Sequence, residues 1–151
     1  MSVVAMATLA LGGVALAGGG ERLGDKAKFD SQITLNYNQG PYDPNDPYYD
    51  EAVFKGKVTV TPANKEAKRR DNARIKCKKK RTVIIRNLDA PDGSSAFATT
   101  KTNRRGRYRV DASQAYTEPG TYRARVTKKR KVRAEVKCFG ARSNTVVAPT
   151  P

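Results

Sequence analysis

Two runs of basic residues are the most concentrated chemistry in this sequence. They are Lys78-Lys79-Lys80-Arg81 and Lys128-Lys129-Arg130-Lys131, and both are expected in or beside turns. Clustered ammonium and guanidinium groups attract anionic partners, such as acidic cell-wall polymers, anionic lipid headgroups and nucleic acid. The runs therefore indicate a polyanion-binding surface. The alternative is a solvated face that keeps the protein soluble and protects edge strands from aggregation.

A second set of basic residues alternates with apolar residues along the chain. Residues two apart in a strand point to the same face, so these positions are expected on outward faces of neighbouring strands. They are Arg107, Arg109, Arg123, Arg125, Arg133 and Lys137. Arg123 and Arg125 complete the predicted polyanion-binding set. We expect no sequence-specific binding of nucleic acid, because the sequence shows neither a recognition helix nor an RNA-binding aromatic motif.

The net charge of +16 is unevenly distributed along the 151 residues. Residues 21–53 contain three basic and seven acidic residues, a net charge of −4, whereas residues 54–151 contain 27 basic and seven acidic residues, a net charge of +20. In one interpretation the two parts neutralise each other, with the acidic region lying as a mobile strap on the basic body. In the other, the basic body binds an anionic partner.

The acidic region contains a candidate calcium site. Its oxygen donors are Asp43, Asn45, Asp46, Asp50 and Glu51. Carboxylates and amides suit calcium, but the spacing departs from that of an EF-hand loop, which requires glycine at its sixth position. Four tyrosines in and around the same region form a candidate platform for stacking on a sugar ring, namely Tyr37, Tyr42, Tyr48 and Tyr49. A carbohydrate-binding module is therefore a further alternative.

The residue type that most catalytic sites require is absent. The sequence contains no histidine. This excludes a Ser-His-Asp triad, a Cys-His pair and a zinc site of the usual kind. We therefore expect no enzymatic activity and no cofactor.

The sequence contains two cysteines, Cys77 and Cys138. In an exported chain an isolated pair predicts a disulfide, with two free thiols or an intermolecular bridge as the alternatives. The cysteines are 61 residues apart. Closing a loop of that length stabilises a fold by about 4 kcal/mol on chain-entropy grounds.

Export is predicted from the beginning of the chain. Residues 2–20 carry no charge, and their apolar run ends in Ala15-Leu16-Ala17, the small-x-small pattern that a signal peptidase accepts. No Lys or Arg precedes the run, which departs from the usual signal peptide. We interpret residues 1–17 as a signal peptide whose removal leaves a secreted or extracytoplasmic protein without a transmembrane segment. A disordered apolar tail or an uncleaved membrane anchor is the alternative.

Alternation of apolar and polar residues predicts seven or eight short strands separated by turn signals. The expected strand regions are residues 31–37, 54–60, 75–88, 95–102, 107–110, 121–126, 132–138 and 143–147. Residues 61–74 are charged and lack an apolar stripe, so we expect at most one helical turn there, around residues 64–68, and no packed helix. The pattern predicts an all-β antiparallel sandwich.

Three local patterns occur together in the basic body. They are FKGKV at residues 54–58, TNRRGRYRV at residues 102–110 and PGTYRARV at residues 119–126. They resemble the F-x-G-x-V strand, the T-N-x-x-G-x-Y-x-V hairpin and the P-G-x-Y-x-A-x-V strand of carboxypeptidase regulatory-like domains. The resemblance covers residues 54–147 and extends to small bacterial exported proteins in which this domain stands alone. It implies an immunoglobulin-like or prealbumin-like sandwich of about seven strands.

Individual residues have expected roles in these patterns. Gly106 is expected to take a positive φ in the hairpin, and Asn103 to bond its own backbone. Tyr108 and Tyr122 are expected to face inward with partners for their hydroxyls. The segment around Tyr122 is similar to the tyrosine corner of immunoglobulin-type sandwiches, with Ala124 where a disulfide cysteine would lie.

The predicted organisation has three parts: a signal peptide at residues 1–17, an acidic leader at residues 18–53 and a basic β-sandwich domain at residues 54–148. The leader is expected to hold one strand and a loop rich in Pro, Tyr and Asp. The resemblance implies a non-enzymatic structural or binding module at the cell exterior. The alternative function is electrostatic binding of anionic cell-wall polymer, acidic polysaccharide or anionic lipid. The sequence does not predict an oligomeric state.

Overall fold

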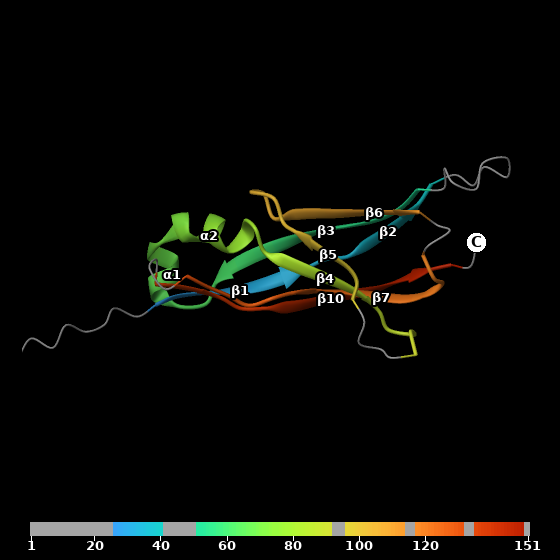
Figure 1. Cartoon of the computed structure of the whole chain (residues 1–151). Helices are drawn as coiled ribbons and strands as arrows, with labels where there is room; N and C mark the ends of the chain where they lie inside the picture. The colour runs from blue at the N-terminus through green and yellow to red at the C-terminus, as the bar shows by residue number, and fades with distance from the viewer. Residues whose placement is uncertain (1–25, 41–50, 92–95, 114–116, 132–134, 150–151) are drawn as a thin grey trace, which may run out of the picture.

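The chain folds mainly into two β-sheets, as the computed structural model shows (Figure 1). The structure describes residues 26–40, 51–91, 96–113, 117–131 and 135–149. The six-stranded sheet consists, in order, of β2 (Asn36–Gln39), β3 (Glu51–Pro62), β1 (Ala27–Ile33), β9 (Val136–Cys138) and β8 (Lys129–Lys131), with β6 (Arg107–Ser113) paired to β3. The four-stranded sheet has the order β10 (Ala141–Ala148), β7 (Gly120–Val126), β4 (Thr82–Asn87) and β5 (Ala96–Lys101).

Strand pairing in the described residues is antiparallel except for the parallel pair of β1 with β9. The prediction of a mainly β, mainly antiparallel fold is therefore confirmed. The strands are more numerous than the seven or so predicted. One reason is that the expected strand at residues 31–37 is divided into β1 and β2, with Leu35 buried between them. The other is that the basic turn at residues 128–131 contributes the short β8.

The two sheets share one hydrophobic core. Phe54 of β3 lies 4.8 Å from Tyr122 of β7, measured between ring centroids, and both rings contact Phe97 of β5. Burial alternates along β4, where Val83, Ile85 and Asn87 face the core. The residues between them face away from the core, because successive side chains of a strand point to opposite sides.

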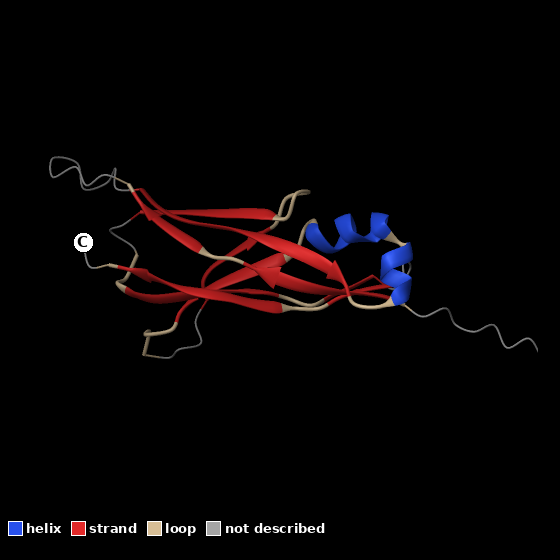
Figure 2. Cartoon of the chain, turned by 180° about the vertical axis from the view of Figure 1, so that it is seen from behind, coloured by secondary structure: helices blue, strands red, loops and turns tan. Residues whose placement is uncertain are grey.

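Two helices, α1 (Lys65–Arg69) and α2 (Asp71–Lys78), lie at one end of the β structure (Figure 2). The sequence prediction is wrong here, because residues 75–78 are helical and the strand begins only at Thr82. The Asn64 side chain caps α1 by accepting a hydrogen bond from the Ala67 amide at 2.9 Å. The buried side of α2 consists of Ala73 and Cys77, one helical turn apart, and so small a buried face produces no visible apolar stripe.

The predicted division into an acidic leader and a basic domain does not follow the fold. Strand β3 crosses the expected boundary between residues 53 and 54. Strands β1 and β2 pair with β3, and Phe29 of β1 is completely buried. From Ala27 onward the described residues therefore form one β structure. The predicted signal peptide at residues 1–17 lies outside the described residues.

The predicted disulfide between Cys77 and Cys138 is confirmed. It joins α2 to β9 with a Cα–Cα distance of 5.6 Å, and both cysteines are buried in the core. Strand β9 lies between β1 and the edge strand β8, so the bond connects the helical end to an interior strand of the six-stranded sheet. The disulfide therefore helps to hold α2 and β9 in place, because each of these elements contributes few other buried side chains.

The local roles expected of Gly106, Asn103 and Tyr122 are observed, but the predicted hairpin is wrong, because β5 pairs with β4 in one sheet and β6 pairs with β3 in the other. Gly106 has a φ of 81°, and a side chain there would collide with the Val58 carbonyl. Asn103 Oδ1 accepts hydrogen bonds from the backbone amides of residues 105 and 107. The Tyr122 hydroxyl donates to the Glu118 carbonyl at 2.7 Å. These contacts fix the beginnings of β6 and β7.

Candidate anion-binding site

The two predicted basic runs lie next to each other. The Lys129 ammonium donates a hydrogen bond to the Lys79 carbonyl at 2.7 Å. Exposed lysines and an arginine surround this contact, namely Lys79, Lys80, Lys128 and Arg130, while Lys78 and Lys129 are half-buried. Lys131 belongs to β8, but its side chain is outside the described part of the chain. The runs therefore form one basic surface, which has the disulfide beneath it.

Arg81 is not part of that surface, which corrects the sequence prediction. Its side chain is only 1% exposed. The guanidinium donates hydrogen bonds to the carbonyls of Cys77, Thr127 and Phe139 at 2.6–3.2 Å and to the Ser31 hydroxyl at 3.2 Å. A buried cation that has used its donors on backbone carbonyls has none left for a ligand. Arg81 is a structural residue.

The environment of Arg81 keeps it charged while buried. Its guanidinium meets the Cys77 carbonyl, one of the last of α2, where the helix dipole favours a positive charge. Burial lowers the pKa of Arg81 to about 10, which still leaves the group protonated at neutral pH. The carbonyls it binds precede β8, follow β9 and end α2, so the side chain connects three parts of the chain around the disulfide.

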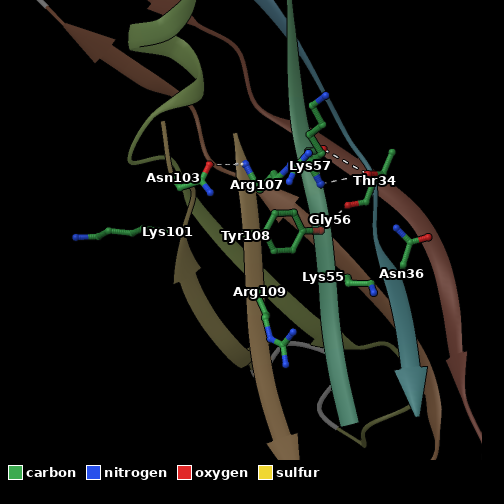
Figure 3. A pocket seen from close by; sticks show the side chains of 10 residues that line it. All are labelled: Thr34, Asn36, Lys55, Gly56, Lys57, Lys101, Asn103, Arg107, Tyr108 and Arg109. Carbon is green, nitrogen blue, oxygen red and sulfur yellow. Dashed lines mark hydrogen bonds between the residues drawn. The ribbon is translucent and has the colours of Figure 1, made fainter. Parts of the chain in front are cut away.

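An open groove of about 570 Å³ lies on the six-stranded sheet beside the connection between β5 and β6 (Figure 3). Five of its lining residues are basic, namely Lys55, Lys57, Lys101, Arg107 and Arg109. The remaining polar lining comes from Thr34, Asn36 and Asn103. We call this site the basic groove.

In the basic groove, basic residues of one strand lie opposite basic residues of the next strand. Lys55 of β3 is directly opposite Arg109 of β6, and Lys57 is directly opposite Arg107. All four side chains are exposed. Like charges directly opposite each other destabilise a sheet. The sheet therefore holds positive charge in an arrangement that folding alone does not favour.

The wall of the groove is built from Tyr108 and Gly56. Figure 3 shows the Tyr108 ring pointing across β3 at Gly56, and its hydroxyl donates to the Thr34 carbonyl at 2.5 Å. A side chain at Gly56 would collide with that carbonyl and with the Tyr108 hydroxyl. Burial raises the pKa of Tyr108 well above its ordinary value of 10, so the hydroxyl remains a neutral donor. The groove thus has a rigid wall and charged edges.

The basic side chains of the groove do not converge on one point. Lys101 extends away from the others in Figure 3, and Arg109 pairs with Asp111 through Nε and Oδ1 at 2.5 Å. Both members of that pair are more than half exposed, so it compensates the charge weakly. An array that is open and spread out fits a partner with repeated charges better than a single small anion.

In comparisons with known proteins, the chain matches no family model, no curated protein and no solved structure. The candidate site therefore depends on its own geometry and charge. Among the described residues, neither helix is long and apolar enough to cross a membrane.

The structure divides the predicted polyanion-binding set. Arg123 and Arg125 lie on β7 of the four-stranded sheet, not on the six-stranded sheet that carries the basic groove. Sequence reasoning did not select Lys55 and Lys57, although their spacing of two within the predicted strand at residues 54–60 was a usable signal. The opposing partners could not be found without the strand register.

The candidate calcium site lies outside the described part of the structure. Asp43, Asn45, Asp46 and Asp50 lie outside the described residues, and so does the side chain of Glu51 at the beginning of β3. Tyr42, Tyr48 and Tyr49 of the suggested sugar platform lie outside them too. Tyr37 is described, and its ring packs on Phe54 at 4.9 Å, half-buried. Within the described ranges no three His, Cys, Asp or Glu side chains are grouped to hold a metal.

Proposed function

We propose that this chain is a non-enzymatic β module that acts outside the cytoplasm and binds anionic polymers along the basic groove. The observation that carries the proposal is the strand register, which places Lys55 opposite Arg109 and Lys57 opposite Arg107 on adjacent strands. An anionic partner lying across both strands relieves this repulsion. Binding of the anion then offsets the repulsion that destabilises the free protein.

The character of the partner follows from the shape of the groove. The site is open and its cations point in different directions, which favours an extended chain with repeated charges, such as anionic cell-wall polymer or acidic polysaccharide. Polymers of this kind bind mainly through released counterions, so affinity depends strongly on salt. Single contacts are each worth little in such a complex.

The disulfide supports the proposed location. Structural disulfides persist in oxidising compartments and are rare in the reducing cytosol. Export through a signal peptide at residues 1–17 is part of the same proposal. Cell-surface polymers are therefore the anions that such a chain would meet.

The proposed class of module is a carboxypeptidase regulatory-like domain with an immunoglobulin-like or prealbumin-like sandwich. Support comes from the motif residues, since Gly106 takes the expected positive φ and Tyr108 and Tyr122 are buried with hydroxyl partners. Gly56 also has a reason to be glycine, because Tyr108 and the Thr34 carbonyl occupy the space of a side chain. An experimental structure with the sheet order of that family would support this assignment, and a different order would refute it.

The salt dependence of heparin binding tests the proposed function. The affinity of the oxidised full chain for heparin is expected to fall linearly on a logarithmic salt scale. The double variant Lys55→Gln/Lys57→Gln removes two groove cations and is expected to make the slope shallower by about 1.5. Isothermal titration calorimetry at several salt concentrations provides both slopes.

A matched control removes the same charge elsewhere. Lys65 and Lys68 are exposed on α1, so Lys65→Gln/Lys68→Gln has the same change in net charge and is expected to leave the slope almost unchanged. Equal effects of the two double variants would mean that only net charge matters and would refute the groove. A slope that responds instead to Lys79→Gln/Lys128→Gln would assign binding to the basic runs.

A further inference from the structure

Four arginines lie together on the outer face of the four-stranded sheet. They line a cavity of about 210 Å³ with Leu88 as its apolar member, and they are Arg86, Arg123, Arg125 and Arg142. Their strand neighbours Ile85, Tyr122 and Ala124 are buried in the core, so the arginines face away from it. We call them the arginine quartet.

The quartet consists of two directly opposed pairs. Arg86 of β4 is opposite Arg123 of β7, and Arg125 of β7 is opposite Arg142 of β10. Neighbouring strands are about 4.8 Å apart, so each pair brings two positive charges together. The ion pairs found within the described residues all involve other arginines, namely Arg70, Arg74 and Arg109. The quartet therefore forms no ion pair with a carboxylate in that part of the chain.

Two donors of the quartet are buried and unused. The Nε atoms of Arg86 and Arg123 are inaccessible to solvent and have no hydrogen-bond partner among the described residues. Nearly all buried polar groups in folded proteins have one, because an unpaired donor loses its bond to water without replacement. The two unpaired donors belong to the same cross-strand pair. An acceptor bound in the cavity that both side chains line would satisfy both donors if the side chains turn toward it.

We propose that the arginine quartet binds a phosphate monoester group. A guanidinium presents its N–H donors as a fork that matches two oxygens of an anion. A carboxylate has two oxygens and saturates one fork, whereas a tetrahedral phosphate or sulfate can engage two. A phosphate monoester carries nearly two negative charges at neutral pH, against one for a sulfate monoester, and this favours phosphate among four cations.

The size of the cavity fits a charged group better than a whole ligand. Small-molecule sites usually occupy about 300–1,000 Å³, and this cavity is smaller. The rest of a ligand would extend over the exposed side chains of Arg125 and Arg142. The site lies on the other sheet from the basic groove, so it does not depend on polymer binding there and can exist without it.

Titration with two matched esters tests the proposal. We choose phenyl phosphate and phenyl sulfate, which carry the same phenyl ring but differ in the charge of the ester group. The chain contains no histidine, so its own charge changes little between about pH 5 and pH 7. The affinity for phenyl phosphate is expected to rise roughly tenfold over that range, following the second ionisation of the phosphate near pH 6. The affinity for phenyl sulfate is expected to be lower and constant.

Substitutions that keep the charge locate the site. The double variant Arg86→Lys/Arg123→Lys retains both positive charges but loses both forks, and its affinity for phenyl phosphate is expected to fall about tenfold. The matched control Arg107→Lys/Arg109→Lys, in the basic groove, is expected to change it less than about twofold. The single variant Arg142→Lys alters an exposed member only and is expected to lose about threefold, whether or not the double variant folds.

Three results would overturn the proposal. The first is binding of phenyl sulfate as tight as that of phenyl phosphate, which would make the site a general oxyanion site. The second is an affinity for phenyl phosphate that does not change with pH. The third is an equal response of the quartet and groove variants, which would remove the site from the four-stranded sheet. Heparin binding by the groove is measured separately and is unaffected by each of these outcomes.

Discussion

Arg81 and the arginine quartet show the same side chain in two opposite situations. Arg81 is buried and all of its guanidinium N–H groups donate to backbone carbonyls or to Ser31. Arg86 and Arg123 of the quartet lie opposite each other on adjacent strands, and their buried Nε atoms have no partner in the part of the chain that the structure describes. The chain itself supplies an acceptor for every donor of Arg81, whereas the free donors of Arg86 and Arg123 would need an anion as acceptor.

The difference shows how charge can be assigned to structure or to binding in a strongly basic protein. Hydrogen bonds to a charged donor stabilise the native state when every donor is used. Opposed cations with unused donors destabilise it unless an anion compensates them. Burial alone does not separate the two cases, whereas the number of satisfied donors does.

The largest predicted effect is the loss of Arg81. In Arg81→Met the carbonyls of Cys77, Thr127 and Phe139 lose their donor, and the free energy of unfolding is expected to fall by about 3 kcal/mol. Denaturant unfolding of the oxidised protein measures this change. The control Arg130→Met makes the same substitution at an exposed site of β8 and is expected to have little effect. Similar stability of both variants would mean that Arg81 is not structural.

Tyr108 lies between the two extremes, because its hydroxyl has one partner, the Thr34 carbonyl. Removal of that hydroxyl in Tyr108→Phe is expected to lower the free energy of unfolding by about 1 kcal/mol at neutral pH. In the same variant, the free energy of unfolding is expected to fall less steeply at alkaline pH than in the wild-type protein. Burial raises the pKa of Tyr108 above the ordinary value of 10, so above about pH 10 the unfolded chain releases a proton that the folded chain keeps.

The raised pKa of Tyr108 is expected to make the wild-type protein less stable at alkaline pH. A native state that binds more protons than the unfolded state becomes less stable as the pH rises, so stability is lost above about pH 10. The lowered pKa of Arg81 acts in the opposite direction, but wild type and Tyr108→Phe share it. Unfolding curves of both proteins at neutral and alkaline pH check the prediction. Parallel loss of stability in the two proteins would contradict it.

The smallest predicted effect has the opposite sign. Replacement of Arg86 by Thr removes one member of an opposed pair, and without ligand it is expected to stabilise the fold by about 0.5 kcal/mol at low salt. The gain is expected to shrink at high salt, because screening weakens repulsion between charges that are partly open to solvent. Thermal unfolding at two salt concentrations measures both changes. Destabilisation at low salt would indicate that the pair is satisfied within the chain.

The sequence predicted those parts of the fold that depend on local patterns. Gly106 and Tyr122 lie in short motifs whose geometry is set within a few residues, and both have their expected conformation or contact. The disulfide followed from the presence of one cysteine pair. The mainly β character followed from alternation, which requires no knowledge of which strands pair.

The candidate sites depended on information that is not local. Lys55 and Arg109 become neighbours through strand register, which joins segments more than fifty residues apart. Arg81 stands in a run of four basic residues, so nothing in the local sequence distinguishes it from its exposed neighbours. Helix α2 buries only Ala73 and Cys77, and the disulfide rather than an apolar stripe holds it in place.

The most direct test of the division between structural and binding arginines is the nuclear magnetic resonance spectrum of their Nε–H groups. Addition of phenyl phosphate to the oxidised full chain is expected to shift the Nε–H signals of Arg86 and Arg123, because their free donors acquire an acceptor. The Arg81 signal is expected to remain in place and to exchange slowly with solvent, since its donors are buried and occupied. Movement of the Arg81 signal while those of Arg86 and Arg123 stay fixed would contradict the account.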